Sequence, residues 1–362
     1  MKLIIEAPLN NLSFGNVSVN LLREFYKQGD DVALFERGNS DLFAFDKLDE
    51  DFKNWINNCI QFRINKVSKD LPTLNLWHIA DSYKRVSKNQ FLFTFHETDS
   101  ITFEEKKLVD LQDGVFLTNQ ESIDSLERVG CKNVHRVNLG FDPDFNVTKV
   151  DKPDNKIHFT LFGKYEKRKH TQEIMKAWLK KYGNNNKYML TCCITNPFLN
   201  PEDMVKIINS ILDFKHYKNI NFLPHLATNT EMNHALNASD IDLTGMSGAE
   251  GWNIPAFNAA ALGKWSIVYN HTGHKSWANS KNCILLEAPE KEECYDGVFF
   301  KRGATSSQGN IYSFNEDQAI EAMEYAIKKA GSINEEGLKL QQDFTYEKTV
   351  KDIKEVMSKS VS

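Results

Sequence analysis

One carboxylate in a run of small residues is the clearest candidate for chemistry. Glu250 follows the apolar stretch 241–244 in the sequence IDLTGMSGAEGWNIP, which ends at Pro255. This order predicts a buried strand, a small-residue loop and a helix that begins near Pro255. Backbone N–H groups at the start of such a helix favour a bound phosphate. An ordinary strand–helix unit with a surface glutamate is the alternative, and the pattern alone leaves both open.

A second segment concentrates positive charge at the end of a predicted strand. The sequence LFGKYEKRKH ends at His170 and contains Lys164, Arg168 and Lys169. Cations placed where a strand ends and a helix begins offset the charge of a leaving diphosphate without a metal ion. The residue types leave a solvated basic turn open as the alternative.

Three residues of the N-terminal half are weaker candidates. His96 comes directly after the predicted strand 91–95, which would place it at the edge of a cleft. His78 lies in a similar apolar run, 76–79, and we assign it a structural role. Gly15 lies in a predicted loop after the first strand, where a lone glycine usually marks a turn. This loop is not a GxGxxG dinucleotide fingerprint.

The acidic and sulfur-containing residues do not predict a metal centre. Acidic triplets occur at 142–144 and 240–242, but the second begins an apolar strand, where a metal ion would be badly placed. We therefore expect no metal and no cofactor. The cysteines are Cys59, Cys131, Cys192, Cys193, Cys283 and Cys294. Because no pair has CxxC spacing, we expect buried free thiols in a reducing cytosol.

Strand and helix patterns alternate along the chain, which is typical of parallel sheets covered on both faces. In the first half we expect strands at 3–5, 32–35, 76–79, 91–95 and 115–118, and helices at 17–25 and 119–130. In the second half we expect strands at 157–162, 189–194, 220–223, 241–244 and 266–269. The helices expected there are 171–182, 204–212, 231–238, 256–262, 316–329 and 346–357.

The length of 362 residues exceeds one ordinary core, so two domains are expected. The polar segment 146–156 contains Pro153 and predicts a linker between them. We predict an α/β fold with two tandem Rossmann-like, doubly wound domains over 1–150 and 151–340 that face a cleft. Residues 341–362 would form a C-terminal helix able to cross back to the N-terminal domain. Ligands of such sheets bind beyond the carboxyl ends of the strands.

The segment EGWNIPAFNAAALGKWSIV resembles the signature of retaining GT-B glycosyltransferases of family four. The resemblance spans most of the chain and is loosest over 36–75. It implies that Glu250 contacts the transferred sugar. Asn258 occupies the position of a second glutamate that holds the ribose of the donor, and asparagine keeps the hydrogen bond without the charge. Asn253 and Ile254, inside the signature, are also expected at the donor.

The resemblance extends to the other candidate segments. Lys164 stands at the position of a family arginine and Lys169 at that of a lysine, so both are expected to hold the diphosphate, with Arg168 as a further cation. Gly15 matches a glycine-containing loop that approaches the donor phosphates. His96 matches a histidine of the N-terminal domain that lies near the transferred sugar.

The family resemblance implies transfer of a hexose from a nucleotide-diphosphate sugar to an acceptor hydroxyl, with retention and without metal. The domain over 151–340 would hold the donor, and the domain over 1–150 would form the acceptor side. A glycan, a lipid-linked sugar, a protein or a modified DNA base all stay open as acceptors, and the oligomeric state is open too. A phosphorylase, an epimerase and a catalytically silent binding module are the alternatives, the last because of Asn258.

Composition narrows the setting. With 41% hydrophobic and 26% charged residues and a net charge of −5, the chain has no overall attraction to nucleic acid or anionic lipid. No apolar run approaches the roughly 20 residues of a membrane helix, and the first residues, MKLII, resemble a strand rather than a signal peptide. We expect a cytoplasmic protein. The richness in Lys and Asn suggests an AT-rich genome, as in a bacterium or a phage.

Overall fold

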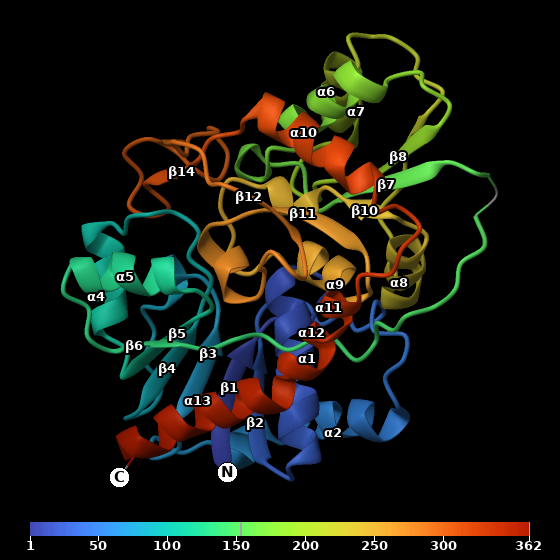
Figure 1. The fold of residues 1–362 in the computed structure, drawn as a ribbon. Helices are drawn as coiled ribbons and strands as arrows, with labels where there is room; N and C mark the ends of the chain where they lie inside the picture. Colours follow the sequence, from blue (N-terminus) through green and yellow to red (C-terminus); the bar gives the residue numbers. More distant parts are fainter. Residues whose placement is uncertain (153, 362) are drawn as a thin grey trace.

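Two six-stranded sheets, one in each half of the chain, form the frame of the molecule (Figure 1). The computed structural model describes residues 1–152 and 154–361. The strand order is β2-β1-β3-β4-β5-β6 in the first sheet and β12-β11-β10-β7-β8-β9 in the second. All of these neighbouring strands are parallel, so each connection crosses over a face of its sheet. The predicted α/β class with two doubly wound sheets is confirmed.

Most elements of the first half are short. Its strands are β1 (Lys2–Ala7), β2 (Asp31–Glu36), β3 (Thr73–Leu76), β4 (Gln90–Phe93), β5 (Gly114–Leu117) and β6 (Val134–Arg136). Its helices are α1 (Ser13–Lys27), α2 (Glu50–Gln61), α3 (Arg63–Lys66), α4 (Phe103–Asp110) and α5 (Gln120–Arg128).

The second half repeats the architecture and adds an antiparallel hairpin. Its sheet strands are β7 (Ile157–Phe162), β8 (Tyr188–Cys193), β9 (Ile220–Phe222), β10 (Ile241–Asp242), β11 (Trp265–Tyr269) and β12 (Ile284–Leu286). The hairpin pairs β13 (Lys291–Glu293) with β14 (Asn310–Tyr312). The helices are α6 (Thr171–Tyr182), α7 (Pro201–Ile211), α8 (Asn229–Asn237), α9 (Ile254–Ala261), α10 (Glu316–Ile327), α11 (Glu335–Leu338), α12 (Leu340–Asp343) and α13 (Tyr346–Val361).

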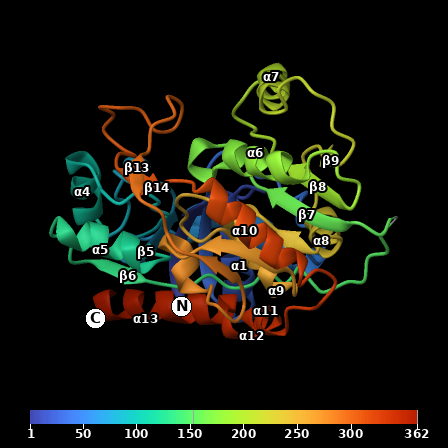
Figure 2. The same cartoon turned by 45° about the horizontal axis from the view of Figure 1, so that its top comes forward.

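Helices cover both faces of the second sheet, which explains why its strands are mostly apolar on both faces, with few exceptions such as Thr160 and Asp242. Figure 2 shows α6 and α10 side by side above the sheet, and buried side chains such as Trp178 and Met323 share one core there. On the other face, Leu236 of α8 and Ala259 of α9 pack near Phe162. A strand with both faces covered has no reason to alternate polar and apolar residues.

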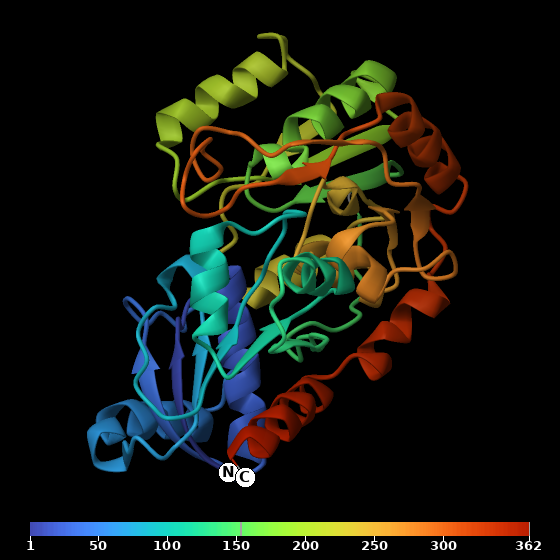
Figure 3. The ribbon, with the colours of Figure 1, turned by 90° about the vertical axis from the view of Figure 1, so that its left-hand side faces the viewer.

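The last helix belongs to the first half in space. Helix α13 runs from the second lobe along the first one (Figure 3). Its residues Val350, Ile353 and Met357 are buried in the core that also contains residues of α1, and Lys354 pairs with Asp30. The domain boundaries at 150 and 340 stay predictions.

Three expectations from sequence need comment. The strand expected at 76–79 is wrong, because β3 ends at Leu76 and the residues from His78 onward form a cap and a short 3-10 turn. The loop expected around Gly15 is wrong too, because helix α1 already begins at Ser13. All six cysteines are free and buried, as predicted. Among the described helices, none combines the length and the apolarity of a membrane span.

The acidic triplet at 142–144 forms an ion cluster where the chain leaves the first half. Arg23 of α1 contacts Asp142 at 3.3 Å and Asp144 at 2.6 Å. Asn20 donates a second hydrogen bond to Asp142 at 2.9 Å. All three charged side chains are buried. The triplet therefore ties α1 to the segment that crosses between the lobes.

We expect Arg23→Met to lower the free energy of unfolding by roughly 3 kcal/mol, because it leaves two buried carboxylates without their cation. Lys27→Met is the matched control on the same helix, since the Lys27–Glu24 pair is largely exposed on the lysine side. Its cost should stay below about 1 kcal/mol. Urea denaturation of both variants measures the difference, and equal losses would show that Arg23 has no special role in stability.

Candidate functional site

The winding of the second sheet reverses between β7 and β10. Strands β8 and β9 follow on one side of β7, whereas β11 and β12 follow on the other side of β10. Connections that leave the carboxyl ends of two such strands diverge, and the crevice between them is where open α/β sheets bind ligands. The segment 163–170 follows β7 and the segment 243–253 follows β10. The topology thus brings together the two sequence segments that carry the candidate residues.

Asn253 fixes the turn from the second segment into α9. Its backbone is left-handed, with φ 65°, a conformation that asparagine tolerates better than most residues. Its side chain caps the helix at Ala256 and donates to the carbonyl of Thr244 and to His274 Nε2, both at 3.0 Å. His274 Nδ1 in turn donates to the carbonyl of Tyr269 at 2.9 Å. The Asn253 amide, predicted at the donor, is therefore engaged in holding the loop.

His274 is the support beneath this cap. Burial lowers its pKa to about 4, because the charged imidazolium would lose its water. The neutral ring can donate at Nδ1 and accept at Nε2, as the two contacts require.

Close packing explains why the loop before α9 is built of small residues. A Cβ on Gly251 would lie 2.5 Å from the ring of Phe95, which belongs to the first half of the chain. A Cβ on Gly248 would lie 2.5 Å from the carbonyl oxygen of Tyr312. The carbonyl of Gly251 also accepts a hydrogen bond from Thr118 Oγ1 at 2.6 Å. The loop is thus clamped between the two halves, and its glycines are required by contact.

Glu250 lies at the centre of the crevice with both oxygens engaged. Lys169 Nζ donates to Oε1 at 2.7 Å, and Arg168 Nη1 donates to Oε2 at 3.0 Å. Its backbone N–H donates to Thr272 Oγ1 at 3.1 Å. Burial raises the pKa of the carboxyl, but the cations of Lys169 and Arg168 outweigh burial and hold the pKa well below its usual range. Glu250 is therefore a buried carboxylate anion at neutral pH.

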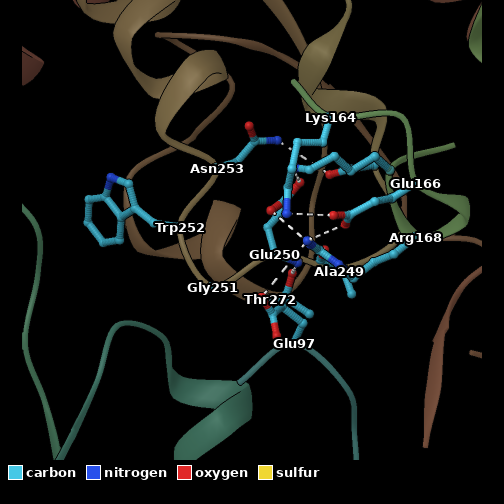
Figure 4. Close-up of polar contacts among 12 residues, drawn as sticks. Glu97, Lys164, Glu166, Arg168, Ala249, Glu250, Gly251, Trp252, Asn253 and Thr272 are labelled. Carbon is cyan, nitrogen blue, oxygen red and sulfur yellow. Dashed lines mark hydrogen bonds and ion pairs between the residues drawn. The ribbon is translucent and has the colours of Figure 1, made fainter. Parts of the chain in front are cut away.

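Arg168 connects this carboxylate to both halves of the chain (Figure 4). Its guanidinium donates to the carbonyl of Ala249 at 2.5 Å and to Glu166 at 3.0 Å. Glu97 of the first half approaches Nη2 at 3.9 Å. The planar guanidinium, with five donors, suits such a junction better than an ammonium group would.

Lys164 is the cation with the most access to solvent. Its ammonium pairs with Glu166 at 2.8 Å, and about a third of its side chain, 34%, is exposed. The rings of Phe198 and Phe299 flank it at 5.2 and 5.5 Å. Burial raises the pKa of Glu166, but the charges of Arg168, Lys169 and Lys164 lower it by more. The pKa of Glu166 is therefore below its usual value. Three cations thus pair with three carboxylates at the crevice, one of them, Glu166, from the same segment as the cations.

The predicted residues of the first half, His96 and Gly15, lie after β4 and at the start of α1. His96 is buried three residues after β4, and its backbone carbonyl accepts from Ser122 Oγ at 2.6 Å. Its Nε2 has no hydrogen-bond partner within the described residues. Gly15 lies in the first turn of α1, where a Cβ would stand 2.2 Å from the carbonyl oxygen of Asn10. Gly15 is thus required for the tight return from β1 into α1.

The remaining donor candidates, Ile254 and Asn258, lie on α9. Ile254 opens the helix and is half-buried, and Asn258 follows one turn later with 4% exposure. Within the described residues, the Asn258 side chain makes no hydrogen bond, which leaves its amide available to a ligand.

Three members of the cluster carried no expectation from sequence. Glu97 and Glu166 could not be predicted from the sequence, because a carboxylate next to lysines or to a histidine is common on surfaces. His274 has no sequence pattern around it that indicates its role. The alternation of charge in KYEKRK was the only local indication of Glu166.

The residues 1–152 and 154–361 contain no grouping of histidine, cysteine and acidic side chains suited to a metal ion. The chemistry that this arrangement offers is binding of an anion by lysine and arginine.

The sequence matches no protein-family model and no curated protein.

Solved structures show where the fold occurs. Sucrose-phosphate synthase from Thermosynechococcus elongatus superimposes with a TM-score of 0.70 at 11% identity, over 99% of this chain and 98% of its own. HepE from Anabaena, in complex with UDP, gives 0.65 at 12% identity, over 99% and 100%. A trehalose-phosphate synthase from Burkholderia xenovorans, bound to glucose-6-phosphate, gives 0.67 at 10% identity, over 99% of both chains. At such identities the likeness establishes the GT-B fold for this chain.

The low pKa of His274 predicts how stability responds to acid. The unfolded chain binds a proton near pH 6.5 and the folded one only near 4, so stability falls as pH drops through this window. Between pH 7 and 5 we expect wild type to lose about 2 kcal/mol more than His274→Gln, at about 1.4 kcal/mol per pH unit. Asp242, whose pKa burial raises to about 6, titrates in both proteins and cancels.

Denaturation curves at several pH values provide this measurement. His216→Gln, at an exposed histidine, controls for the loss of an imidazole as such. Identical pH dependence in wild type and His274→Gln would contradict the assignment.

Proposed function

We propose that this protein is a glycosyltransferase that moves a sugar from a nucleotide-diphosphate donor to an acceptor hydroxyl. The observation that carries the proposal is the cluster of Lys164, Arg168 and Lys169 around the buried Glu250, at the crevice between β7 and β10. The GT-B fold supports it, because structures of this fold include HepE bound to UDP and to UDP-glucose.

In this proposal the donor lies along the start of α9. Lys164 and Lys169 receive the diphosphate, exchanging their carboxylate partners for phosphate oxygens, while Arg168 holds the cluster in place. Glu250 accepts hydrogen bonds from hydroxyls of the sugar. Asn258 binds the ribose with its unused amide, and the backbone of Asn253 and Ile254 faces the phosphates.

The proposed chemistry requires no metal ion. The bond between the anomeric carbon and the diphosphate oxygen breaks, and the lysines stabilise the charge that develops on the leaving group. The acceptor oxygen then bonds to the same face of a hexose, and its proton passes to the departing phosphate. His96 and the first turn of α1 around Gly15 close the crevice from the acceptor side. The six free, buried thiols are consistent with a reducing cytoplasm as the proposed compartment.

One observation favours a second candidate, a binding module without catalysis. Every cation of the cluster already has a carboxylate partner from Glu97, Glu166 or Glu250, so the crevice is balanced in charge without a ligand. Slow hydrolysis of a donor in the absence of acceptor separates the two, because a silent module would release no nucleotide diphosphate.

Lys169→Ala tests the diphosphate clamp. Loss of one charge-assisted contact to phosphate should weaken donor binding roughly tenfold to a hundredfold. The measurement is titration calorimetry with the nucleotide sugar that stabilises wild type most in a thermal-shift screen of UDP-, GDP-, ADP- and dTDP-sugars. Lys167→Ala, two residues away and 40% exposed, is the control and should bind normally. Unchanged affinity in Lys169→Ala would remove this residue from the clamp.

Metal removal is a separate test. Because lysine ammonium groups carry the phosphate charge in this proposal, donor affinity and turnover should change less than twofold in excess EDTA. A tenfold loss that Mg²⁺ or Mn²⁺ restores would show that the diphosphate is held through a metal.

A further inference from the structure

A row of aromatic rings begins at the Glu250 loop and runs outward along the first sheet. The ring of Phe95 packs against Gly251, and Phe14 lies 5.0 Å beyond it, centre to centre. The next two rings are those of His78, 4.8 Å from Phe14, and Trp77, 5.6 Å from Phe14. The row therefore links the buried carboxylate of the second half to the surface of the first half.

Topology places this row where a second ligand is expected. The winding of the first sheet reverses between β1 and β3, because β2 lies on one side of β1 and β4 lies beyond β3. Phe14 comes after β1, and Trp77 and His78 come directly after β3. The rings thus occupy the carboxyl ends of strands at the reversal, the position at which this kind of sheet binds ligands.

Exposure distinguishes these rings from core aromatics. Phe91 and Phe93, inside the first sheet, are fully buried at 0% exposure. In the row, Phe14 is buried at 6%, Phe95 and Trp77 are half-buried, and His78, to which the sequence alone assigned a structural role, is exposed. Buried rings thus support a partly open aromatic surface beside the crevice.

Polar groups surround the open end of the row. Arg37 lies over the Trp77 ring at 5.6 Å, and the indole N–H donates to Asp81 at 3.0 Å. Arg37 is already paired with Glu6 at 3.1 Å, and it also donates to Asn75 at 3.2 Å. Asp81, Glu6 and Arg37 can form hydrogen bonds with the hydroxyl groups of a sugar. Because Glu6 already neutralises the charge of Arg37, this guanidinium is poorly suited to bind a phosphate.

We propose that the Phe14–Trp77–His78–Phe95 row is the acceptor subsite and that it takes an uncharged saccharide. The C–H face of a pyranose ring packs on Trp77 and His78, and its hydroxyls bind the side chains of Asp81 and the Glu6–Arg37 pair. The assignment of this saccharide as the acceptor rests on the proposed function. The saccharide site itself can be tested without a donor.

Saturation-transfer NMR on the full chain, without nucleotide sugar, tests the subsite. The probes are the methyl glycosides of glucose, galactose and mannose, N-acetylglucosamine, and glucose 6-phosphate as the charged comparison. We expect at least one neutral probe to receive saturation on its C–H face, and glucose 6-phosphate to receive less than glucoside. Trp77→Ala should reduce the signal at least fivefold, whereas Trp77→Phe should retain most of it.

Two controls separate this inference from the proposed function and from misfolding. Phe62→Ala removes an exposed ring in the connection between α2 and α3 and should bind saccharide normally. Lys169→Ala should lose donor affinity and keep the saccharide signal. Saccharide binding without donor binding would overturn the transferase proposal alone. No signal from any neutral probe, an equal signal in Trp77→Ala, or stronger binding of glucose 6-phosphate would overturn the subsite.

Discussion

The ion pair between Arg168 and Glu250 is the interaction on which the rest of the crevice depends. It joins the turn after β7 to the loop before α9, at 3.0 Å, and together with Lys169 it holds the pKa of Glu250 well below its usual range against the opposing effect of burial. Glu97 brings the first half to the same guanidinium. A buried ion pair is a weak source of stability compared with apolar packing, but its directional contacts define one arrangement of the loops.

A steric constraint acts together with this electrostatic one. Gly251 lies under the Phe95 ring, and its carbonyl accepts from Thr118. Any side chain at this position would push the halves apart and separate Glu97 from Arg168. Packing and charge therefore favour the same closed geometry.

The sequence predicted much of this fold, because strands and helices that alternate along the chain produce a regular succession of short apolar runs and amphipathic segments. The small-residue loop 243–253 and the basic turn 163–170 could also be recognised from their composition. The prediction failed at β3, because the polar Asn75 interrupts the apolar pattern of this buried strand. The run WHI at 77–79, which predicts a strand, lies beyond the end of β3. The prediction also placed Gly15 in a loop, since no residue type marks that α1 begins two residues earlier. Glu97, Glu166 and His274 acquire their roles only from neighbours distant in sequence, which local patterns cannot reveal.

The two walls of the crevice differ in chemistry for a structural reason. The second sheet reverses at β7 and β10, whose loops carry charges, and the first reverses at β1 and β3, whose loops carry aromatic rings. Charges that pair across a buried loop leave little room for adjustment, whereas the partly exposed rings offer apolar surface with few directional contacts. Under the proposed function, the charged wall therefore holds the donor diphosphate, and the aromatic wall meets the saccharide acceptor.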